Sequence, residues 1–567
     1  LVEVARLRGH VVGGLMHLRG GLVGLADGHL QLLHVGRRAL GAACGFTDAA
    51  RDFVGCGRLL LHRDGDGGGE AFGVLHRRRD RADRLDRGRG RFLNGRDMFG
   101  DALGRVRGLA GESLHLLRDD GEAATCAAGV VPSLPAADGG KVELRLVFTH
   151  IPPEKPTWPN VGYDYEGRKK VLTEKLRQAC PNVEFLPATA MNAQEGRKLL
   201  DQDSEVDGYL VYMLGLWTGV GRILADAGKR CIFVDDLYGG SGEFLGCYAA
   251  ARRKGQKVVG VSSTRFEDVA RAVRIFETIR ALRSDIILDV INRDPGATAR
   301  AIEDVFGAKV RQVTGDEINE AYQKADAAEG KKMAQLWIKG AQKVVEPKVE
   351  EIEKSGRMYV AMNNLMERYK SRAITVDCLG LFYAGKLEAY PCLGFFHLNN
   401  EGKVGACEAD LRSTISMLAM GHLVGRPGYI SDPVIDTSKN QIIYAHCVAP
   451  SKVYGPNGKS NPYHIRDHSE DRKGAAVRSL LPVGEIVTSI ETNPVTQEIV
   501  IHTARTVANI DEDKACRTKI AAEVKDIDKL LGEWDRWGWH RVTFYGDYRR
   551  QVADFAALAG FRIVEEG

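Results

Sequence analysis

The sequence predicts an α/β fold of the doubly wound, Rossmann- or flavodoxin-like kind, followed by a β-rich C-terminal domain. From residue 141 onward, short apolar runs alternate with helical patterns. Such alternation is typical of a parallel sheet that helices cover on both faces. After about residue 385 the pattern changes to alternating runs such as VTSIETN and QEIVIHTARTV, separated by Pro, Gly and Asn. Those runs favour antiparallel strands.

The first α/β domain is expected over residues 141–284, with five strands and four helices between or after them. The strands are expected at 141–150, 183–191, 206–214, 229–237 and 257–263. The helices, where apolar residues recur at helical spacing, are expected at 166–180, 217–228, 241–255 and 267–284. Ligands on such sheets bind beyond the carboxyl ends of strands. The loop DDLYGGSGE after the fourth strand is therefore expected to contact substrate, with Asp236 as the candidate residue.

A second α/β domain is predicted over 285–384 and the β-rich domain over 385–567. The second domain has an expected strand at 285–291, long charged helices around 315–370 and a further strand at 373–382. Two helices are expected within the β-rich domain, at 411–424 and 548–560.

The first 140 residues have a different composition, with no Lys, Ile, Tyr or Trp but 20 Arg and 28 Gly. Lys, Ile and Tyr have AT-rich codons, whereas Arg and Gly have GC-rich ones. We interpret residues 1–122 as a spurious leader read from a wrong frame or strand; the alternative is a natural Arg/Gly-rich disordered extension. Residues 123–140 are interpreted as a linker or a signal-peptide remnant. Neither segment is assigned a function.

The overall composition excludes several classes of partner. The net charge is only +4, from 79 basic and 75 acidic residues, so neither a nucleic-acid groove nor an anionic membrane is implied. The sequence contains no run of 18 apolar residues, so no membrane-spanning helix is predicted. The eleven cysteines form no CxxC pairs, which favours free thiols. A cytoplasmic location is expected, with export as the alternative if 123–138 is a signal-peptide remnant.

Four residues of the C-terminal part have the chemistry of a divalent-metal site. They are Glu408 in GACEADLRST, Asp432 in YISDPVID, His446 in YAHCVAP and His540 in WGWHRVTFYGD. Carboxylates with imidazole suit Mn²⁺ or Mg²⁺ better than a closed thiolate zinc site. Each also has a structural interpretation. Glu408 could stabilise a helix start, Asp432 a turn, and both histidines could simply pack in the core.

These motifs resemble the L-fucose/L-arabinose isomerase family, particularly its C-terminal domain. The similar pattern is G-A-C-E-A-D-L, a helix, G-H-L-x-G-R-P, then S-D-P, H-C-x-x-P and W-H-R-V-x-F. The resemblance implies that Glu408 and Asp432 are metal-binding acids and that His540 is the final histidine ligand. His446 matches a histidine of the arabinose branch. The resemblance also implies Mn²⁺ as cofactor, with Mg²⁺ as the alternative, and a homotrimer or homohexamer.

The resemblance implies a reaction that interconverts an aldose and a ketose through a cis-enediol. In that reaction a divalent cation steadies the developing negative charge, and two carboxylates move protons, roles expected of Glu408 and Asp432. The candidates for contact with the monosaccharide are His446, His468, Trp539 and Asp236. A non-catalytic carbohydrate-binding or sensing protein that uses the same cleft is the alternative. A nucleotide-dependent enzyme is disfavoured, because no phosphate-binding glycine motif follows a strand.

Overall fold

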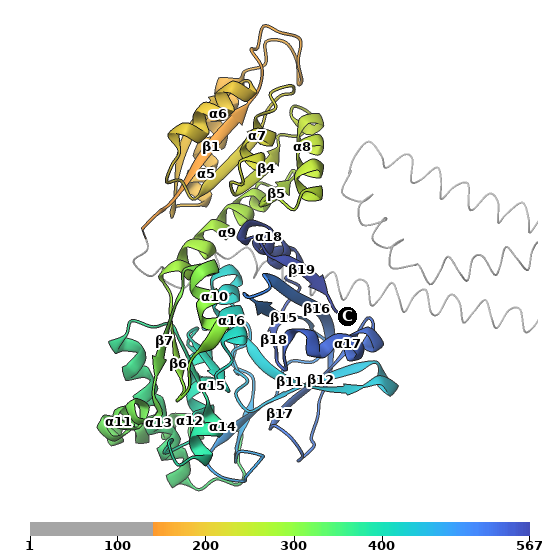
Figure 1. The fold of residues 1–567 in the computed structure, drawn as a ribbon. Helices are drawn as coiled ribbons and strands as arrows, with labels where there is room; N and C mark the ends of the chain where they lie inside the picture. The colour runs from red at the N-terminus through yellow and green to blue at the C-terminus, as the bar shows by residue number, and fades with distance from the viewer. Residues whose placement is uncertain (1–139) are drawn as a thin grey trace, which may run out of the picture. The chain divides into compact units, whose positions relative to one another are not determined.

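The computed structural model describes residues 140–567, so the predictions for residues 1–122 and 123–139 lie outside the described range. The described chain contains two parallel sheets, one closed antiparallel sheet and a small three-stranded sheet (Figure 1). The prediction of parallel α/β sheets followed by a β-rich region is confirmed. The finer assignment to the Rossmann- or flavodoxin-like class stays a prediction.

The first sheet is parallel, with the strand order β2-β1-β3-β4-β5. Its strands are β1 Val142–Thr149, β2 Val183–Ala190, β3 Gly208–Met213, β4 Cys231–Asp235 and β5 Val258–Val261. Successive strand side chains enter two different hydrophobic cores, as expected from the two-residue period of a strand. One core contains α5 (Tyr165–Ala179) and α9 (Phe266–Ser284). The other contains α6 Ala193–Gln202, α7 Val220–Asp226 and α8 Ser241–Arg253.

The second parallel sheet has the order β10-β9-β6-β7. Its strands are β6 Ile286–Val290, β7 Lys309–Val313, β9 Ala373–Val376 and β10 Val404–Cys407. Because β10 pairs with β9, this sheet continues past residue 384, where the sequence predicted the domain to end. Its helices are α10 Gly296–Phe306, α11 Gly315–Lys324, α12 Ala327–Gly340, α13 Val349–Arg368, α14 Cys378–Tyr383 and α15 Cys392–Asn400.

The strand expected over 373–382 is wrong beyond residue 376. The Asp377 side chain accepts a hydrogen bond from the Gly380 N–H and starts α14, so the chain turns into a helix after β9. A capping carboxylate of this kind satisfies an N–H that the first helical turn leaves free.

The third sheet is closed, with the order β15-β18-β11-β12-β17-β16 and a second pairing between β15 and β16. β19 lies parallel to β16 outside this ring. The strands are β11 Tyr429–Asp436, β12 Gln441–His446, β15 Ile486–Asn493, β16 Glu498–Asn509, β17 Thr518–Val524, β18 Arg541–Tyr545 and β19 Arg562–Glu565. Two helices complete this part, α17 Ile527–Glu533 and α18 Arg549–Ala559. The barrel-like closure leaves few unpaired edges.

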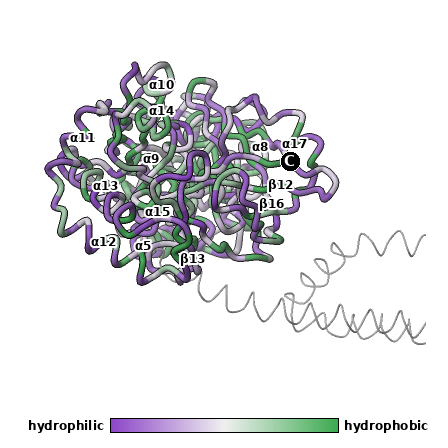
Figure 2. Tube along the Cα trace, turned by 90° about the horizontal axis from the view of Figure 1, so that it is seen from below, coloured by the Kyte–Doolittle hydropathy of each residue, from purple (hydrophilic) through white to green (hydrophobic). Residues whose placement is uncertain are grey.

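The helix predicted over 411–424 is confirmed as α16, Leu411–Val424. It contacts strands of both the second and the closed sheet, and it packs on α9. Nine of its fourteen residues are buried and the others are partly exposed, so most of the helix surface faces the core rather than solvent. Figure 2 shows apolar segments concentrated in the interior and hydrophilic ones along outer loops. Within residues 140–567, no helix is both long and apolar enough to cross a bilayer.

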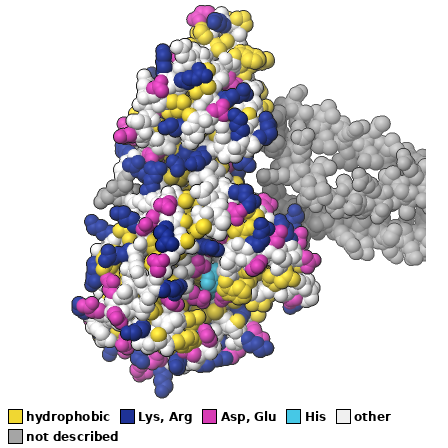
Figure 3. Space-filling model, in the orientation of Figure 1, with side chains coloured by type: hydrophobic (Ala, Val, Ile, Leu, Met, Phe, Trp, Pro, Cys, Tyr) yellow, Lys and Arg dark blue, Asp and Glu magenta, His cyan; other side chains and the backbone are white. Residues whose placement is uncertain are grey.

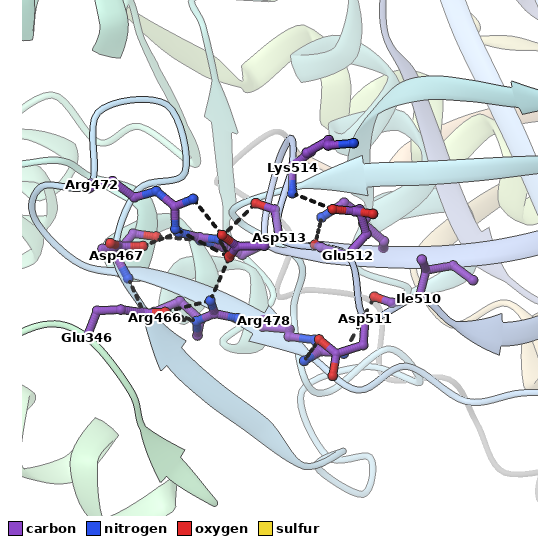
Figure 4. A network of polar contacts seen from close by, with 12 residues as sticks. Glu346, Arg466, Asp467, Arg472, Arg478, Ile510, Asp511, Glu512, Asp513 and Lys514 are labelled. Carbon is purple, nitrogen blue, oxygen red and sulfur yellow. Dashed lines mark hydrogen bonds and ion pairs between the residues drawn. The ribbon is translucent and has the colours of Figure 1, made fainter.

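A small sheet and an ion-pair network support the outer end of the closed sheet. The small sheet consists of β8 Lys343–Val344, β13 Tyr463–Arg466 and β14 Ala476–Ser479. In the network (Figure 4), Arg466 pairs with Glu346 and with Asp513. The buried Arg517 pairs with Asp467 and Asp513. These contacts tie the loop between β16 and β17 to the loop that follows β13.

A second buried charge network lies behind β18. Arg541 donates two hydrogen bonds to Glu566, at 2.9 and 2.8 Å, and Glu566 also bonds His502 Nδ1 at 2.8 Å. The His502 Nε2 contacts the Tyr444 hydroxyl at 2.6 Å. Burial acts to raise the pKa of Glu566, but His502 and Arg541 outweigh it and lower that pKa to about 2.

We predict that Glu566→Gln lowers the free energy of unfolding by about 3–5 kcal/mol, because it leaves buried Arg541 without its counter-charge. Because the native pKa of Glu566 is depressed, its contribution is present above the unfolded pKa of about 4.3 and is lost as the pH falls towards about 2. Urea unfolding between pH 7 and pH 3 measures both effects. The exposed neighbour Glu565→Gln is the control, and equal stability of the two variants would contradict the prediction.

Candidate metal centre

Glu408 lies in a tight turn between β10 and α16. Glu408 and Ala409 have φ values of 63° and 52°, in the left-handed region that side-chain-bearing residues seldom adopt. The Ala409 N–H donates to the Val376 carbonyl of β9 at 3.0 Å, which holds the turn against the second sheet. The turn therefore presents the Glu408 carboxylate at the carboxyl end of a parallel sheet, where such sheets bind ligands.

Asp432 enters the same site from β11 of the closed sheet. Its Oδ1 accepts a hydrogen bond from the Trp539 indole N–H at 2.7 Å. Its Oδ2 lies 3.6 Å from the Cys516 thiol, which donates to it. These contacts fix the orientation of the carboxylate.

His540 immediately precedes β18 and faces both carboxylates. Its Nε2 lies 3.3 Å from Asp432 Oδ1 and 3.4 Å from Glu408 Oε2. Its Nδ1 contacts Asp410 Oδ2 at 2.8 Å. In the neutral ring, an Nδ1–H donated to Asp410 leaves the Nε2 lone pair on the side of the two carboxylates, where a bound cation would accept it. Among the described residues, this buried Nε2 has no hydrogen-bond partner.

Asp410 is the residue that orients His540, and the sequence reasoning missed it. Its Oδ1 accepts from the backbone N–H groups of Arg412 and Ser413, so it is the N-cap of α16. Its Oδ2 accepts from the Ser413 hydroxyl as well as from His540. A carboxylate behind a histidine is the usual support of a metal-binding imidazole. The signal that could have found it is the N-cap pattern at the start of the predicted helix.

The electrostatics of the cluster favour a positive charge at its centre. Burial acts to lower the pKa of His540, but contacts with Asp410, Asp432 and Glu408 outweigh it and raise that pKa well above the ordinary value. Burial acts to raise the pKa of Asp432, but His446, His540 and Trp539 lower it to about 2. In the same way, the pKa of Glu408 is lowered, mainly by His540 and His446. Three carboxylates thus converge on one imidazole.

The spacing of these groups fits a divalent cation. Ligand atoms about 2.1 Å from a cation, at right angles to each other, lie about 3 Å apart. The 3.3 and 3.4 Å separations from His540 Nε2 are close to that value. Ligand atoms of Asp432, His446 and His540 all lie within 4.8 Å of one another. With the buried, unpartnered His540 Nε2, the residues fit an Mn²⁺ or Mg²⁺ site.

His446 ends β12 and has a different hydrogen-bonding state. Its Nδ1 accepts a hydrogen bond from the Cys447 N–H at 3.0 Å. In a neutral ring the proton then sits on Nε2, which lies 3.7 Å from Glu408 Oε1. An Nε2–H donates to an oxygen instead of offering a lone pair. Both roles considered for His446 stay predictions: its ligand atom lies within 4.8 Å of those of Asp432 and His540, and its buried Nε2 has no hydrogen-bond partner among the described residues.

The other predicted substrate contacts fall in different places. Trp539 lies beside the cluster, with 61% of its surface exposed. His468 is buried and stacks on Tyr390, with ring centroids 4.4 Å apart. Burial lowers its pKa, and the charge of Glu408 is among those that act against this shift. Asp236 follows β4 of the first sheet and is paired with Arg168 at 2.5 Å. Asp236 does not line the cavity described below.

A cavity of about 380 Å³ opens beside the cluster, between the second sheet and the closed sheet. Figure 3 shows histidine surface in a hollow, with charged side chains nearby. The sequence reasoning also missed several residues that line this cavity. They are Asp289, Arg293, Arg412 and Glu491. No local motif marks them, because only the tertiary fold brings them to one cavity.

Comparison with known proteins gives partial matches to sugar isomerases. No protein-family model matches the chain. It is 26% identical over 193 residues to the sulfoquinovose isomerase of Alkalicoccus urumqiensis, covering 32% of this chain and 42% of that protein. It is 30% identical over 116 residues to those of Priestia aryabhattai and Priestia megaterium, covering 20% of this chain and 25% of each. The chain spans less than half the length of these curated relatives. Assignment to the L-fucose/L-arabinose family in particular stays a prediction.

We predict that Mn²⁺ binds this site and that Asp432→Asn and His540→Gln each weaken binding at least tenfold, because each removes a ligand atom. Isothermal titration calorimetry of the full chain with MnCl₂ measures the effect. His464→Gln on β13, a histidine outside the cluster, is the control. Binding of equal strength in all four proteins would contradict the assignment.

We predict that Asp410→Asn weakens Mn²⁺ binding about 10- to 100-fold with α16 intact, because the amide caps the helix but no longer fixes the His540 tautomer. Asp526→Asn, at the N-cap of α17, changes the same kind of cap away from the site. Equal losses of affinity in the two variants, or none in either, would show that Asp410 does not act through His540.

Proposed function

We propose that the chain is a metal-dependent aldose–ketose isomerase that acts on a monosaccharide through a cis-enediol. The observation that carries the proposal is the convergence of Glu408, Asp432 and His540 beside a cavity, with the buried His540 Nε2 left without a partner. The partial similarity to proteins named sulfoquinovose isomerase supports the same reaction class. A binding or sensing protein would not need two ionised carboxylates at the reacting end of its ligand.

Glu408, Asp432 and His540 would hold the cation, Mn²⁺ in the first instance and Mg²⁺ as the alternative. When bound, the cation supplies Lewis-acid stabilisation of negative charge on the two substrate oxygens. Oxygen-rich ligand sets with one imidazole suit both ions. Asp410 keeps the His540 ring in the tautomer that offers its Nε2 lone pair.

Glu408 is the proposed base. Its lowered pKa keeps the carboxylate ionised at neutral pH, ready to accept a proton. It takes the hydrogen of substrate C2 as a proton, and the electron pair of that C–H bond forms the C1=C2 bond of the enediol. Asp432 moves the hydroxyl proton between O1 and O2. The C1=O1 electron pair moves onto O1, which takes the proton that Asp432 removes from O2. Glu408 then returns its proton to C1 through the C1=C2 electron pair, while the electron pair on O2 forms the C2=O2 carbonyl of the ketose.

The remaining groups would position the sugar. The His446 Nε2–H is placed to donate a hydrogen bond to a substrate oxygen near Glu408. The exposed face of Trp539 suits packing against the apolar face of a sugar ring, and its N–H is already used by Asp432. The names of the relatives make sulfoquinovose the first aldose to test, with L-fucose and L-arabinose next by resemblance.

We predict that the full chain converts at least one of these aldoses with Mn²⁺ and that excess EDTA abolishes the conversion. Glu408→Gln should lower kcat about 10²- to 10⁴-fold, because the amide cannot accept the proton. Ketose formation, followed by chromatography, is the measurement.

The control is Glu350→Gln, an exposed acid in the first turn of α13. A Glu408→Gln variant with full activity would overturn the assignment of the base. Tight sugar binding without conversion, with either metal, would instead identify a carbohydrate-binding or sensing protein.

A further inference from the structure

The cavity beside the metal centre has an unneutralised cationic group in its wall. Arg412, the second residue of α16, is half-buried and lines the cavity together with Glu408 and His540. Its side chain donates one hydrogen bond, from Nη1 to the Trp537 carbonyl at 3.3 Å. Within residues 140–567, no carboxylate lies within ion-pair distance of it. A guanidinium keeps its charge at every physiological pH, so Arg412 has a positive charge that a bound anion would neutralise.

Two of the acids that line the cavity with Arg412 have other partners. Asp410 binds His540 and the Ser413 hydroxyl through Oδ2, and its Oδ1 accepts from backbone N–H groups. Asp294, another cavity residue, lies 3.5 Å from Arg300. Both carboxylates therefore have a positive or donating neighbour already.

Two further acids in the wall, Glu491 and Asp289, are buried and have raised pKa values. Burial, with repulsion from Asp410, raises the pKa of Glu491 well above its ordinary value. Burial raises the pKa of Asp289 to about 7. One oxygen of Asp289 is buried and has no hydrogen-bond partner among the described residues. This side of the cavity thus combines a guanidinium that has no ion-pair partner among the described residues with two buried carboxyl groups of raised pKa.

We infer that Arg412 binds an acidic group carried by the sugar: a sulfonate, phosphate or carboxylate on the end distant from the reacting carbons. The planar guanidinium matches such an oxyanion with two parallel N–H donors. A second guanidinium, Arg293, lines the same cavity from the loop after β6, although it is exposed and paired with Asp377 at 2.7 Å. The cavity volume of about 380 Å³ lies within the range of small-molecule sites.

The inference deepens the proposed function, on which it rests for the reacting end of the sugar. Asp410, which contacts His540 at the metal-binding end of the site, is two residues before Arg412, which is the proposed anion-binding group. The first turn of α16 would therefore carry groups for both ends of the sugar. The substrate class is then an acidic monosaccharide, and neutral aldoses are expected to be poor substrates. A neutral hydroxyl would form a weaker hydrogen bond with Arg412 than an anionic oxygen would, because a hydrogen bond between two charged groups is roughly twice as strong as one between neutral groups.

The test compares four aldohexoses that differ at C6: glucose, glucuronate, glucose 6-phosphate and sulfoquinovose. With the Mn²⁺-loaded full chain, kcat/KM for at least one acidic sugar should exceed that for glucose by about ten- to a hundredfold, as expected for hydrogen bonds to a charged group. Arg412→Gln should remove most of this ratio, and Arg412→Lys should keep part of it. The control is Arg549→Gln, which changes a surface arginine paired with Asp547.

A binding measurement separates this inference from the proposed function. Glucitol and glucitol 6-phosphate cannot be isomerised as aldoses, so calorimetry with them reports binding alone. Tighter binding of the phosphate that Arg412→Gln abolishes would support the anion site even if no aldose were converted. Conversion of glucose at least as efficient as that of every acidic sugar would overturn the inference and leave the isomerase standing. This wild-type comparison decides the question even if Arg412→Gln fails to fold.

Discussion

The site depends on one carboxylate that has two structural tasks. Asp410 caps α16 through one oxygen and holds the His540 ring through the other. The start of the helix and the direction of the imidazole are therefore fixed by the same group. Because α16 lies between the second sheet and the closed sheet, this contact also joins the two parts of the chain that supply Glu408 and Asp432.

The closed sheet positions His540 by the ordinary alternation of side chains. His540 faces the cavity, and the next residue, Arg541, points the other way into the buried network with Glu566 and His502. That network is fully enclosed, so it anchors the start of β18 without taking part in the chemistry. The loop between β16 and β17, tied down by the ion pairs of Figure 4, supplies Cys516, whose thiol contacts Asp432.

Much of the fold was predictable because it depends on local patterns. The bounds of α16 and the alternation of strands and helices follow from residue periodicity. Glu408, Asp432 and His540 were named as candidates from their motifs, and the structure brings them together. Contacts between distant segments were not predictable in this way. Neither the addition of β10 to the second sheet nor the closure of β15 on β16 has a local signal.

The same reason explains which site residues were missed. Arg412 appeared only as part of a helix, and nothing in its neighbours indicates that its charge is unpaired. Asp289 lies in β6, a buried strand of the second sheet that is far from residues 408–412 in sequence. The role of Asp236, the identity of the cation and the trimeric or hexameric assembly remain predictions, since they depend on groups beyond this chain.

The left-handed turn at Glu408 and Ala409 has a consequence for engineering. Both residues adopt a backbone conformation that glycine accepts with far less strain. Selection for thermal tolerance alone would therefore favour glycine there, and at position 408 that gain would delete the carboxylate. Heat-resistant variants should therefore not be sought at position 408, because its strained backbone carries a carboxylate of the proposed metal site.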